Sequence, residues 1–247
     1  MIAEAAHQHL RPNPRRLPKR KAVTLVAAIS CLDRLIVIGD REENSEYAGK
    51  RSIPKIYESV GEHWRMGIGS AGSGPLGDKA AKQIILAAKQ DDNFPSRAID
   101  LIEEELKKIY TKYIFPFNER KQSERGISLV IGIKEITSGL NLVYKTYEEI
   151  VKEDDWYACA GSGQDIAHYF LDNFYDDLSS GEEVERFMYF VAREAKLSVG
   201  GVGGQTEMLT LHDSGLVERT LLGQTMEARE IPPLQDCMAK FWKSQKG

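Results

Sequence analysis

Cysteine is scarce in this chain of 247 residues, and its three copies form no recognisable pattern. Cys31, Cys159 and Cys237 include no CxxC pair and are odd in number, so the sequence predicts neither a disulfide framework nor a zinc knuckle. Cys31 and Cys159 lie inside apolar runs typical of strands, and we expect both to be buried, unreactive thiols. This cysteine usage favours a reducing cytoplasm.

Long hydrophobic runs are also missing. None approaches the roughly 18 apolar residues that a membrane-spanning helix needs. Residues 1–21 are basic but have no apolar segment of the kind that a secretory signal contains. We therefore expect a soluble, cytoplasmic protein without a membrane partner.

Metal-ligand and nucleotide-binding patterns are absent as well. His7 and His9 lie close together near the N-terminus, whereas the other three histidines stand alone in the sequence, which does not indicate a metal site. The glycine-rich stretch at residues 69–79, GSAGSGPLGDK, lacks the GK[ST] ending of a phosphate-binding loop. We expect no cofactor.

Charge is distributed unevenly along the chain. Residues 1–21 hold six basic side chains and one acidic side chain, although the formal net charge of the whole chain is −4. A basic arm can bind nucleic acid or anionic lipid. No aromatic residue is interleaved in it, however, and the acidic remainder would repel a phosphate backbone. We expect a solvated N-terminal extension or propeptide over 1–22, one domain over 23–247, and no nucleic-acid partner.

The hydrophobic pattern predicts alternating blocks of strands and helices. An apolar, β-branched run over residues 23–38, interrupted at residues 31–34, predicts a hairpin of buried strands. The remaining predictions are strands within 52–59, 63–74, 126–136, 140–147, 156–163 and 207–221, and helices over 79–89, 97–113, 164–175, 182–196 and 234–242. Antiparallel strand blocks that alternate with helix pairs indicate an α+β fold of two stacked sheets, each with helices on its outer face.

Five short stretches of the sequence are informative when they are taken together and in their order along the chain. They are VTLVAAISCLDRLIVIGD (23–40), KIY (55–57), GIGSAGSG (67–74), YACAGSGQDIAHYFLDN (157–173) and VGGQTEMLTL (202–211). In sequence they resemble subunits of the 20S proteasome and its bacterial relatives, members of the N-terminal-nucleophile (Ntn) hydrolase superfamily. The resemblance covers roughly residues 23–212 and implies a four-layer αββα sandwich of mainly antiparallel sheets.

Active members of that family use a threonine that becomes the first residue after the chain is cut. A threonine hydroxyl is too weak an acid to attack an amide unaided, whereas a free α-amine with a pKa of about 7.7–8.0 is a usable base at neutral pH. Placing nucleophile and base on one residue supplies the proximity effect directly. The resemblance thus implies a threonine-type hydrolase of peptide or other amide bonds.

Carried over residue by residue, the resemblance makes Thr24 the nucleophile and Asp40 its aspartate. The spacing between them, across one hairpin, matches the family. On the residues alone, Thr24 also fits an ordinary β-branched strand position and Asp40 a turn-capping carboxylate. Both interpretations remain open at this point.

The remaining site residues follow from the same resemblance. The family's lysine falls at Arg51 when counted back from KIY, with Lys50 one place away, and an arginine would supply charge but no shiftable amine. Gly72 matches the glycine whose N–H donates to the oxyanion. Ser162 matches the serine beside the threonine amine.

Two features depart from the active pattern. An acidic residue followed three later by a serine is expected after the fourth helix, but this chain offers Leu197 or Ser198 and then Gly200. Active precursors carry glycine before the threonine, and here it is Val23.

Two hypotheses therefore stand for the function. In one, Val23 marks a GUG start codon or residues 1–23 are removed, and Thr24 becomes a free nucleophile. In the other, the extension stays attached and the protein is a non-catalytic, α-type structural subunit. The resemblance also implies a homo-oligomer, as a ring or stacked assembly, built through the helices within 79–113.

Overall fold

The computed structural model describes residues 24–45, 49–119, 122, 125–175 and 180–222. The predicted N-terminal extension over 1–22, the predicted helix over 234–242, and Cys237 lie outside these residues. The domain boundary at residues 22–23 thus stays a prediction.

Strands and helices in the described ranges follow the predicted alternation. The elements are β1 (Val26–Ser30), β2 (Arg34–Asp40), β3 (Glu42–Ser45), β4 (Gly49–Ser52), β5 (Ile56–Val60), β6 (Trp64–Gly72), α1 (Gly74–Gln90), α2 (Ala98–Tyr113), β7 (Ile127–Glu135), β8 (Asn141–Tyr147), β9 (Ile150–Asp154), β10 (Tyr157–Ala160), α4 (Gln164–Phe174), α5 (Gly181–Ser198), β11 (Thr206–His212) and β12 (Val217–Leu222).

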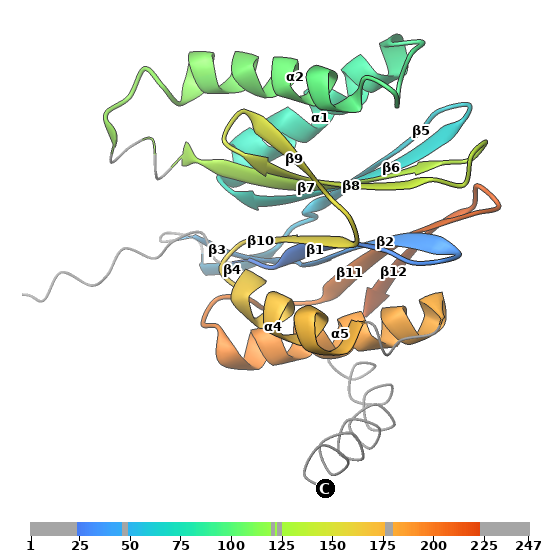
Figure 1. The fold of residues 1–247 in the computed structure, drawn as a ribbon. Helices are drawn as coiled ribbons and strands as arrows, with labels where there is room; N and C mark the ends of the chain where they lie inside the picture. Colours follow the sequence, from blue (N-terminus) through green and yellow to red (C-terminus); the bar gives the residue numbers. More distant parts are fainter. Residues whose placement is uncertain (1–23, 46–48, 120–121, 123–124, 176–179, 223–247) are drawn as a thin grey trace, which may run out of the picture.

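Among the residues that the structure describes, the strands form three antiparallel sheets, which confirms the α+β class with antiparallel pairing. One five-stranded sheet has the order β10-β1-β2-β11-β12 and the other β5-β6-β7-β8-β9, while β3 and β4 pair separately. Figure 1 shows the two large sheets face to face, with α1 and α2 over the outer side of one and α4 and α5 over the outer side of the other. In the described ranges, no helix combines the length and the hydropathy that crossing a membrane requires.

Apolar side chains fill the spaces between these elements. One buried cluster joins α4 and α5 to β1 and β2, and a second joins α1 and α2 to β6 and β7. A third cluster, which includes Val26, Val37 and Val130, lies between the two large sheets. Because β1 is covered on both faces, all five of its residues are buried, which explains its continuous apolar sequence.

Several element boundaries differ from the predictions. Helix α1 begins at Gly74, five residues before the predicted start, because Pro75 fits the first turn of a helix. The short strands β3, β4 and β9 were not predicted. All four residues of strand β4 are exposed, so its sequence carries no apolar alternation that could reveal it.

Candidate functional site

Thr24 and Asp40 meet at one end of the β1–β2 hairpin. Thr24 lies two residues before β1, and Asp40 ends β2. The Asp40 N–H donates to the Leu25 carbonyl at 3.1 Å, which closes this end of the hairpin. Thr24 is 3% exposed and Asp40 2%. The hydrophobic hairpin therefore carries two polar side chains into a buried position.

Lys55 is the third member of this cluster. It lies just before β5 and is 9% exposed. Its Nζ donates to Thr24 Oγ1 at 2.7 Å and contacts both Asp40 carboxylate oxygens at 3.0 Å. The Thr24 hydroxyl in turn donates to Asp40 Oδ1. An ammonium, a hydroxyl and a carboxylate are thus in mutual contact.

Backbone amides from three segments fix the Asp40 carboxylate. Leu25 N–H donates to Oδ1 at 2.8 Å, and the N–H groups of Glu42 and Gly203 each donate to Oδ2 at 3.2 Å. The Asp40 side chain therefore joins the residue before β1, the first residue of β3 and the loop before β11.

The Lys55 ammonium is held in a largely dry environment. Burial lowers the pKa of Lys55 from its ordinary value, while the Asp40 carboxylate acts in the opposite direction. Nζ also donates to the Glu42 carbonyl at 2.6 Å, so its three N–H groups are shared among Thr24, Asp40 and Glu42. A charge so held lowers the cost of forming an alkoxide on a contacting hydroxyl.

The turn after β10 surrounds the backbone of Thr24. The Thr24 N–H donates to Ser162 Oγ at 3.2 Å, and the Gly163 N–H donates to the Thr24 carbonyl at 3.0 Å. Gly161 has a φ of +94°, and a Cβ there would overlap the Thr24 carbonyl. Glycine is needed at this position because of both the conformation and the close approach.

Gly72 is the last residue of β6, the strand that pairs with β5, and Lys55 lies just before β5. Its φ is +100°, and a Cβ would overlap the Gly126 carbonyl. The N–H of Ser70, two residues earlier, donates to the Lys55 carbonyl at 2.9 Å. Strand β6 thus connects the backbone of Gly72 with that of Lys55.

Lys50 and Arg51 are not brought to Thr24. Lys50 lies on β4, its side chain is 73% exposed, and it pairs with Glu42 at 3.0 Å. Arg51 is exposed on the same strand. The cation at Thr24 is Lys55, which sequence reasoning missed although it is the first letter of the quoted KIY stretch.

The segment that departs from the active pattern lies at the end of α5. Leu197 is 70% exposed there, and the helix ends at Ser198. Further along the chain, the Gly203 N–H donates to the Asp40 carboxylate.

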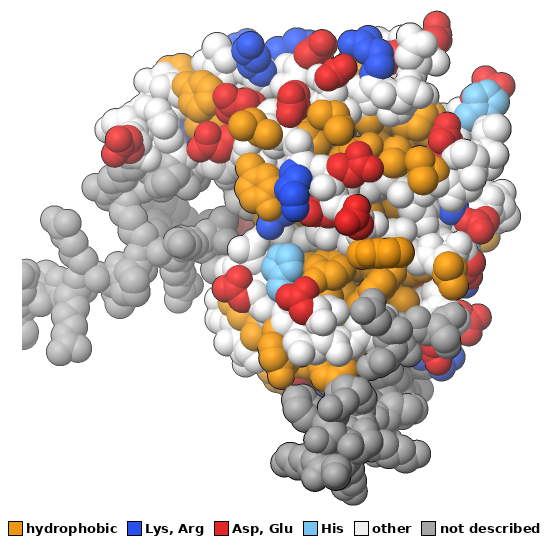
Figure 2. Space-filling view, viewed as in Figure 1, with side chains coloured by type: hydrophobic (Ala, Val, Ile, Leu, Met, Phe, Trp, Pro, Cys, Tyr) orange, Lys and Arg blue, Asp and Glu red, His pale blue; other side chains and the backbone are white. Residues whose placement is uncertain are grey.

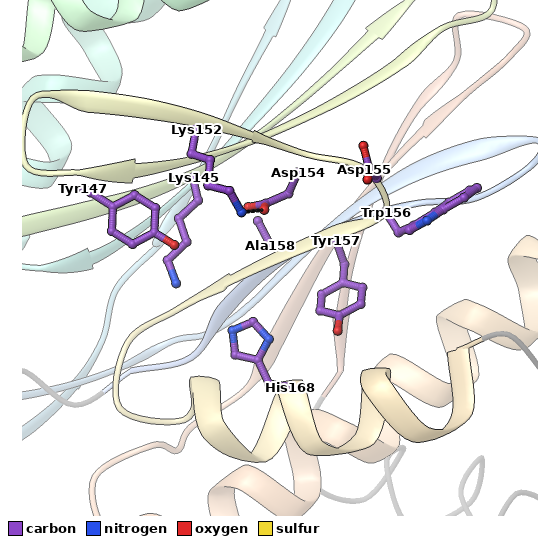
Figure 3. Close-up of a pocket in the computed structure, with 9 residues that line it drawn as sticks. All are labelled: Lys145, Tyr147, Lys152, Asp154, Asp155, Trp156, Tyr157, Ala158 and His168. Carbon is purple, nitrogen blue, oxygen red and sulfur yellow. Dashed lines mark hydrogen bonds and ion pairs between the residues drawn. The ribbon is translucent and has the colours of Figure 1, made fainter.

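A cavity of about 280 Å³ lies elsewhere, between β8, β9, β10 and α4. Figure 3 shows Lys145 and His168 on opposite sides of it, with Tyr157 extending toward α4. In Figure 2 the hydrophobic side chains on this face are interrupted by acidic and basic ones. The residues that line this cavity include none of Thr24, Asp40 and Lys55.

Two further groups bear on the possible chemistry. Burial raises the pKa of both Cys31 and Cys159 to about 12, so neither is a thiolate near neutral pH. Within the part of the chain that the structure describes, no three His, Cys, Asp or Glu side chains gather so as to hold a metal ion.

Neither a protein-family model nor a curated protein matches this sequence. Solved structures do resemble its fold. The helical assembly of the Anbu complex from Pseudomonas aeruginosa is 16% identical with a TM-score of 0.68, covering 88% of this chain and 96% of that one. Anbu (ancestral beta-subunit) from Yersinia bercovieri is 12% identical with a TM-score of 0.69, covering 89% and 97%. A Gly-1 mutant of Anbu from Hyphomicrobium sp. strain MC1 is 14% identical with a TM-score of 0.69, covering 91% and 100%.

These neighbours correct the assignment made from the sequence. The five stretches pointed to a 20S proteasome subunit or a bacterial relative of one, but the similar structures are Anbu proteins, a proteasome-like family that is related yet distinct. The identification as a 20S proteasome-like subunit is therefore wrong. What the comparison shows for this chain, at such low identity, is the fold of the Anbu proteins.

Proposed function

We propose that this chain is a threonine-type amidohydrolase in which Thr24 Oγ1 is the nucleophile once the Thr24 amine is free. The observation that carries the proposal is the position of the Lys55 ammonium, 2.7 Å from Thr24 Oγ1 and 3.0 Å from each Asp40 oxygen. A cation held on a hydroxyl by a buried carboxylate is the arrangement that an alkoxide-forming step requires.

The reaction follows from these contacts. The free amine of Thr24 takes the hydroxyl proton, and Oγ1 attacks the carbonyl carbon of the amide. The tetrahedral intermediate collapses as the leaving amine receives that proton, which leaves an ester on Oγ1. Water, deprotonated by the same amine, then hydrolyses the ester and regenerates Thr24. Lys55 stabilises the negative charge on Oγ1 and Asp40 keeps Lys55 in place.

Gly72 and Ser162 have supporting roles in this proposal. The Gly72 N–H would donate to the developing oxyanion, where the lack of a side chain leaves room for substrate. Ser162 Oγ accepts from the Thr24 nitrogen at 3.2 Å and would orient the free amine. In the uncut chain that nitrogen is an amide, which cannot act as a base.

The amine becomes available by one of two routes. Either residues 1–23 are removed, or translation begins at Val23 and the initiating methionine is cleaved before Thr24. If neither occurs, the protein is a non-catalytic structural subunit. This alternative is supported by Val23, which replaces the glycine of active precursors.

We infer the finer architecture from the same observations. The three buried clusters and the two helix pairs support a four-layer αββα sandwich of the Ntn type over residues 23–247. We also infer a homo-oligomer, since one similar structure is a helical assembly. Monomers in size-exclusion chromatography with light scattering would contradict the second inference. The cytoplasm remains the predicted compartment.

N-terminal sequencing and intact mass of the protein from its native host test the freed amine. In parallel, a fusion cleaved to leave Thr24 first would be assayed on a mixture of fluorogenic peptide amides, alongside the Thr24→Ser and Thr24→Ala variants. We expect turnover by the free-amine protein, partial turnover by Thr24→Ser and none by Thr24→Ala. A native chain that starts at residue 1 or 2 would overturn the proposal in favour of the structural subunit, and equal turnover by Thr24→Ala would overturn the assignment of Thr24 as the nucleophile.

A further inference from the structure

Lys55 lies at the start of a strand that is supported by its own sheet on one side only. Strand β5 is an edge strand and pairs with β6 alone. The other edge strand at this end of the molecule, β12, belongs to the opposite large sheet. If the Lys55 ammonium is to keep its contact with the Thr24 hydroxyl, the start of β5 must be fixed against that opposite sheet.

Arg219 of β12 makes this connection. Its Nη1 donates to the carbonyl of Ile56, the residue after Lys55, at 3.4 Å. Its Nη2 and Nε donate to Glu58 Oε2 at 3.0 and 3.3 Å. One guanidinium thus contacts the backbone and a side chain of β5 from across the sheet pair.

A buried carboxylate holds Arg219 in turn. Glu207 of β11 is 1% exposed and accepts from Arg219 Nη1. Its other oxygen lies 3.6 Å from Nη1 of Arg41, the residue that follows Asp40. Glu207 is therefore paired directly with Arg41, the residue beside Asp40, and is linked through Arg219 to Ile56, the residue beside Lys55.

This arrangement is costly for stability alone. Burying a charged carboxylate between two guanidinium groups requires desolvation that an apolar replacement would avoid. Two atoms in it, Arg41 Nε and Glu207 Oε2, are buried without a hydrogen-bond partner. What these charged groups do is connect the two segments that carry Asp40 and Lys55.

We propose that Glu207 and Arg219 are positioning residues that hold the Lys55 ammonium on the Thr24 hydroxyl. The inference rests on the proposed function for its catalytic meaning, because Lys55 matters to turnover only if Thr24 is a nucleophile. The position of Lys55 itself can be tested without measuring turnover.

The test follows the titration of Lys55 by NMR in the full chain labelled on its lysines, with the resonance assigned by its loss in Lys55→Arg. The variants are Glu207→Gln and Arg219→Gln. When Lys55 loses its position it moves toward water, so its pKa should rise toward the ordinary value of 10.5, by about half a unit or more, in both variants. Removal of charge alone predicts opposite shifts, a fall without Glu207 and a rise without Arg219.

The control is a matched ion pair at the other end of the hairpin. Arg34 and Glu185 are partly buried and lie 2.9 Å apart, and Arg34→Gln should leave the Lys55 titration unchanged. If the glutamine variants unfold, as judged by circular dichroism, Arg219→Lys decides the question. Arg219→Lys keeps the positive charge but lacks the planar guanidinium, whose several N–H groups reach Ile56 and Glu58 together. It should therefore still raise the pKa of Lys55.

The two proposals fail in distinguishable ways. Opposite shifts in the folded glutamine variants, or no shift, would overturn the positioning role. Lack of turnover by the free-amine protein would overturn the hydrolase while the Lys55 titration still decides the positioning question. If turnover is present, loss of position should lower kcat with little change in KM.

Discussion

The side chains of Lys55 and Thr24 come from different sheets and meet at 2.7 Å. Thr24 precedes β1, while Lys55 precedes β5 in the facing sheet. The contact therefore depends on how the two sheets pack as well as on either strand. Glycines at the interface allow that packing, since a Cβ on Gly69 would lie 2.9 Å from Val26.

Replacing Lys55 should abolish most of the turnover. We expect Lys55→Met in the free-amine protein to lower kcat/KM by about 10²-fold or more, because the hydroxyl loses its contacting cation. Lys50→Met is the matched control, since Lys50 is exposed and paired with Glu42, and it should retain nearly full activity. A loss of the same size in both variants would contradict the assignment of Lys55.

The pH–rate profile should be bell-shaped. Activity rises as the Thr24 amine loses its proton, near a pKa of about 7.7–8.0. It falls when Lys55 loses its proton, below the ordinary value of 10.5, because burial lowers the pKa of Lys55. In Lys55→Arg the alkaline fall should disappear, since arginine stays charged throughout. An alkaline limb that survives in this variant would point to another group.

Gly161 should tolerate no side chain. Gly161→Ala combines a φ of +94° with overlap of the Thr24 carbonyl, whereas Gly139→Ala has a φ of +74° and open space around it. We expect Gly139→Ala to cost about 1 kcal/mol of unfolding free energy and Gly161→Ala at least about 1 kcal/mol more. Urea denaturation measures both, and equal costs would mean that the overlap relaxes freely.

The buried thiols should be inert in the folded protein. In a Cys237→Ser background the remaining thiols are Cys31 and Cys159, whose pKa values burial raises to about 12. We expect no reaction with a disulfide reagent at pH 8 and reaction of both in denaturant. Fast native labelling of either thiol would show that its strand opens readily.

Sequence reasoning succeeded where burial alone dictates the pattern. The β1–β2 hairpin is covered on both faces, so its apolar residues had to be continuous, and its length brings Thr24 beside Asp40. The helix predicted over 182–196 likewise lies within α5, most of whose apolar side chains are buried.

It failed where the outcome depends on contacts between distant segments. Lys55 reaches Thr24 because β5 lies in the facing sheet, and the spacing of residues along the chain does not reveal a contact between two sheets. Strands β3 and β4 are polar and short, so period-2 alternation cannot reveal them. Their pairing sets the backbone of Lys50 opposite Asn44, and the Lys50 side chain pairs with Glu42. Arg51 is exposed on the same strand, away from the position that spacing predicted.

The three backbone amides on Asp40 have an evolutionary consequence. They join segments that start at residues 25, 42 and 203, so losing the carboxylate would loosen the fold itself. A lineage without catalysis would still retain this aspartate under selection for folding, and with it Lys55, because loss of the lysine would leave the Asp40 carboxylate buried without its ion-pair partner. Among related chains, neither residue alone is then a marker of an active enzyme.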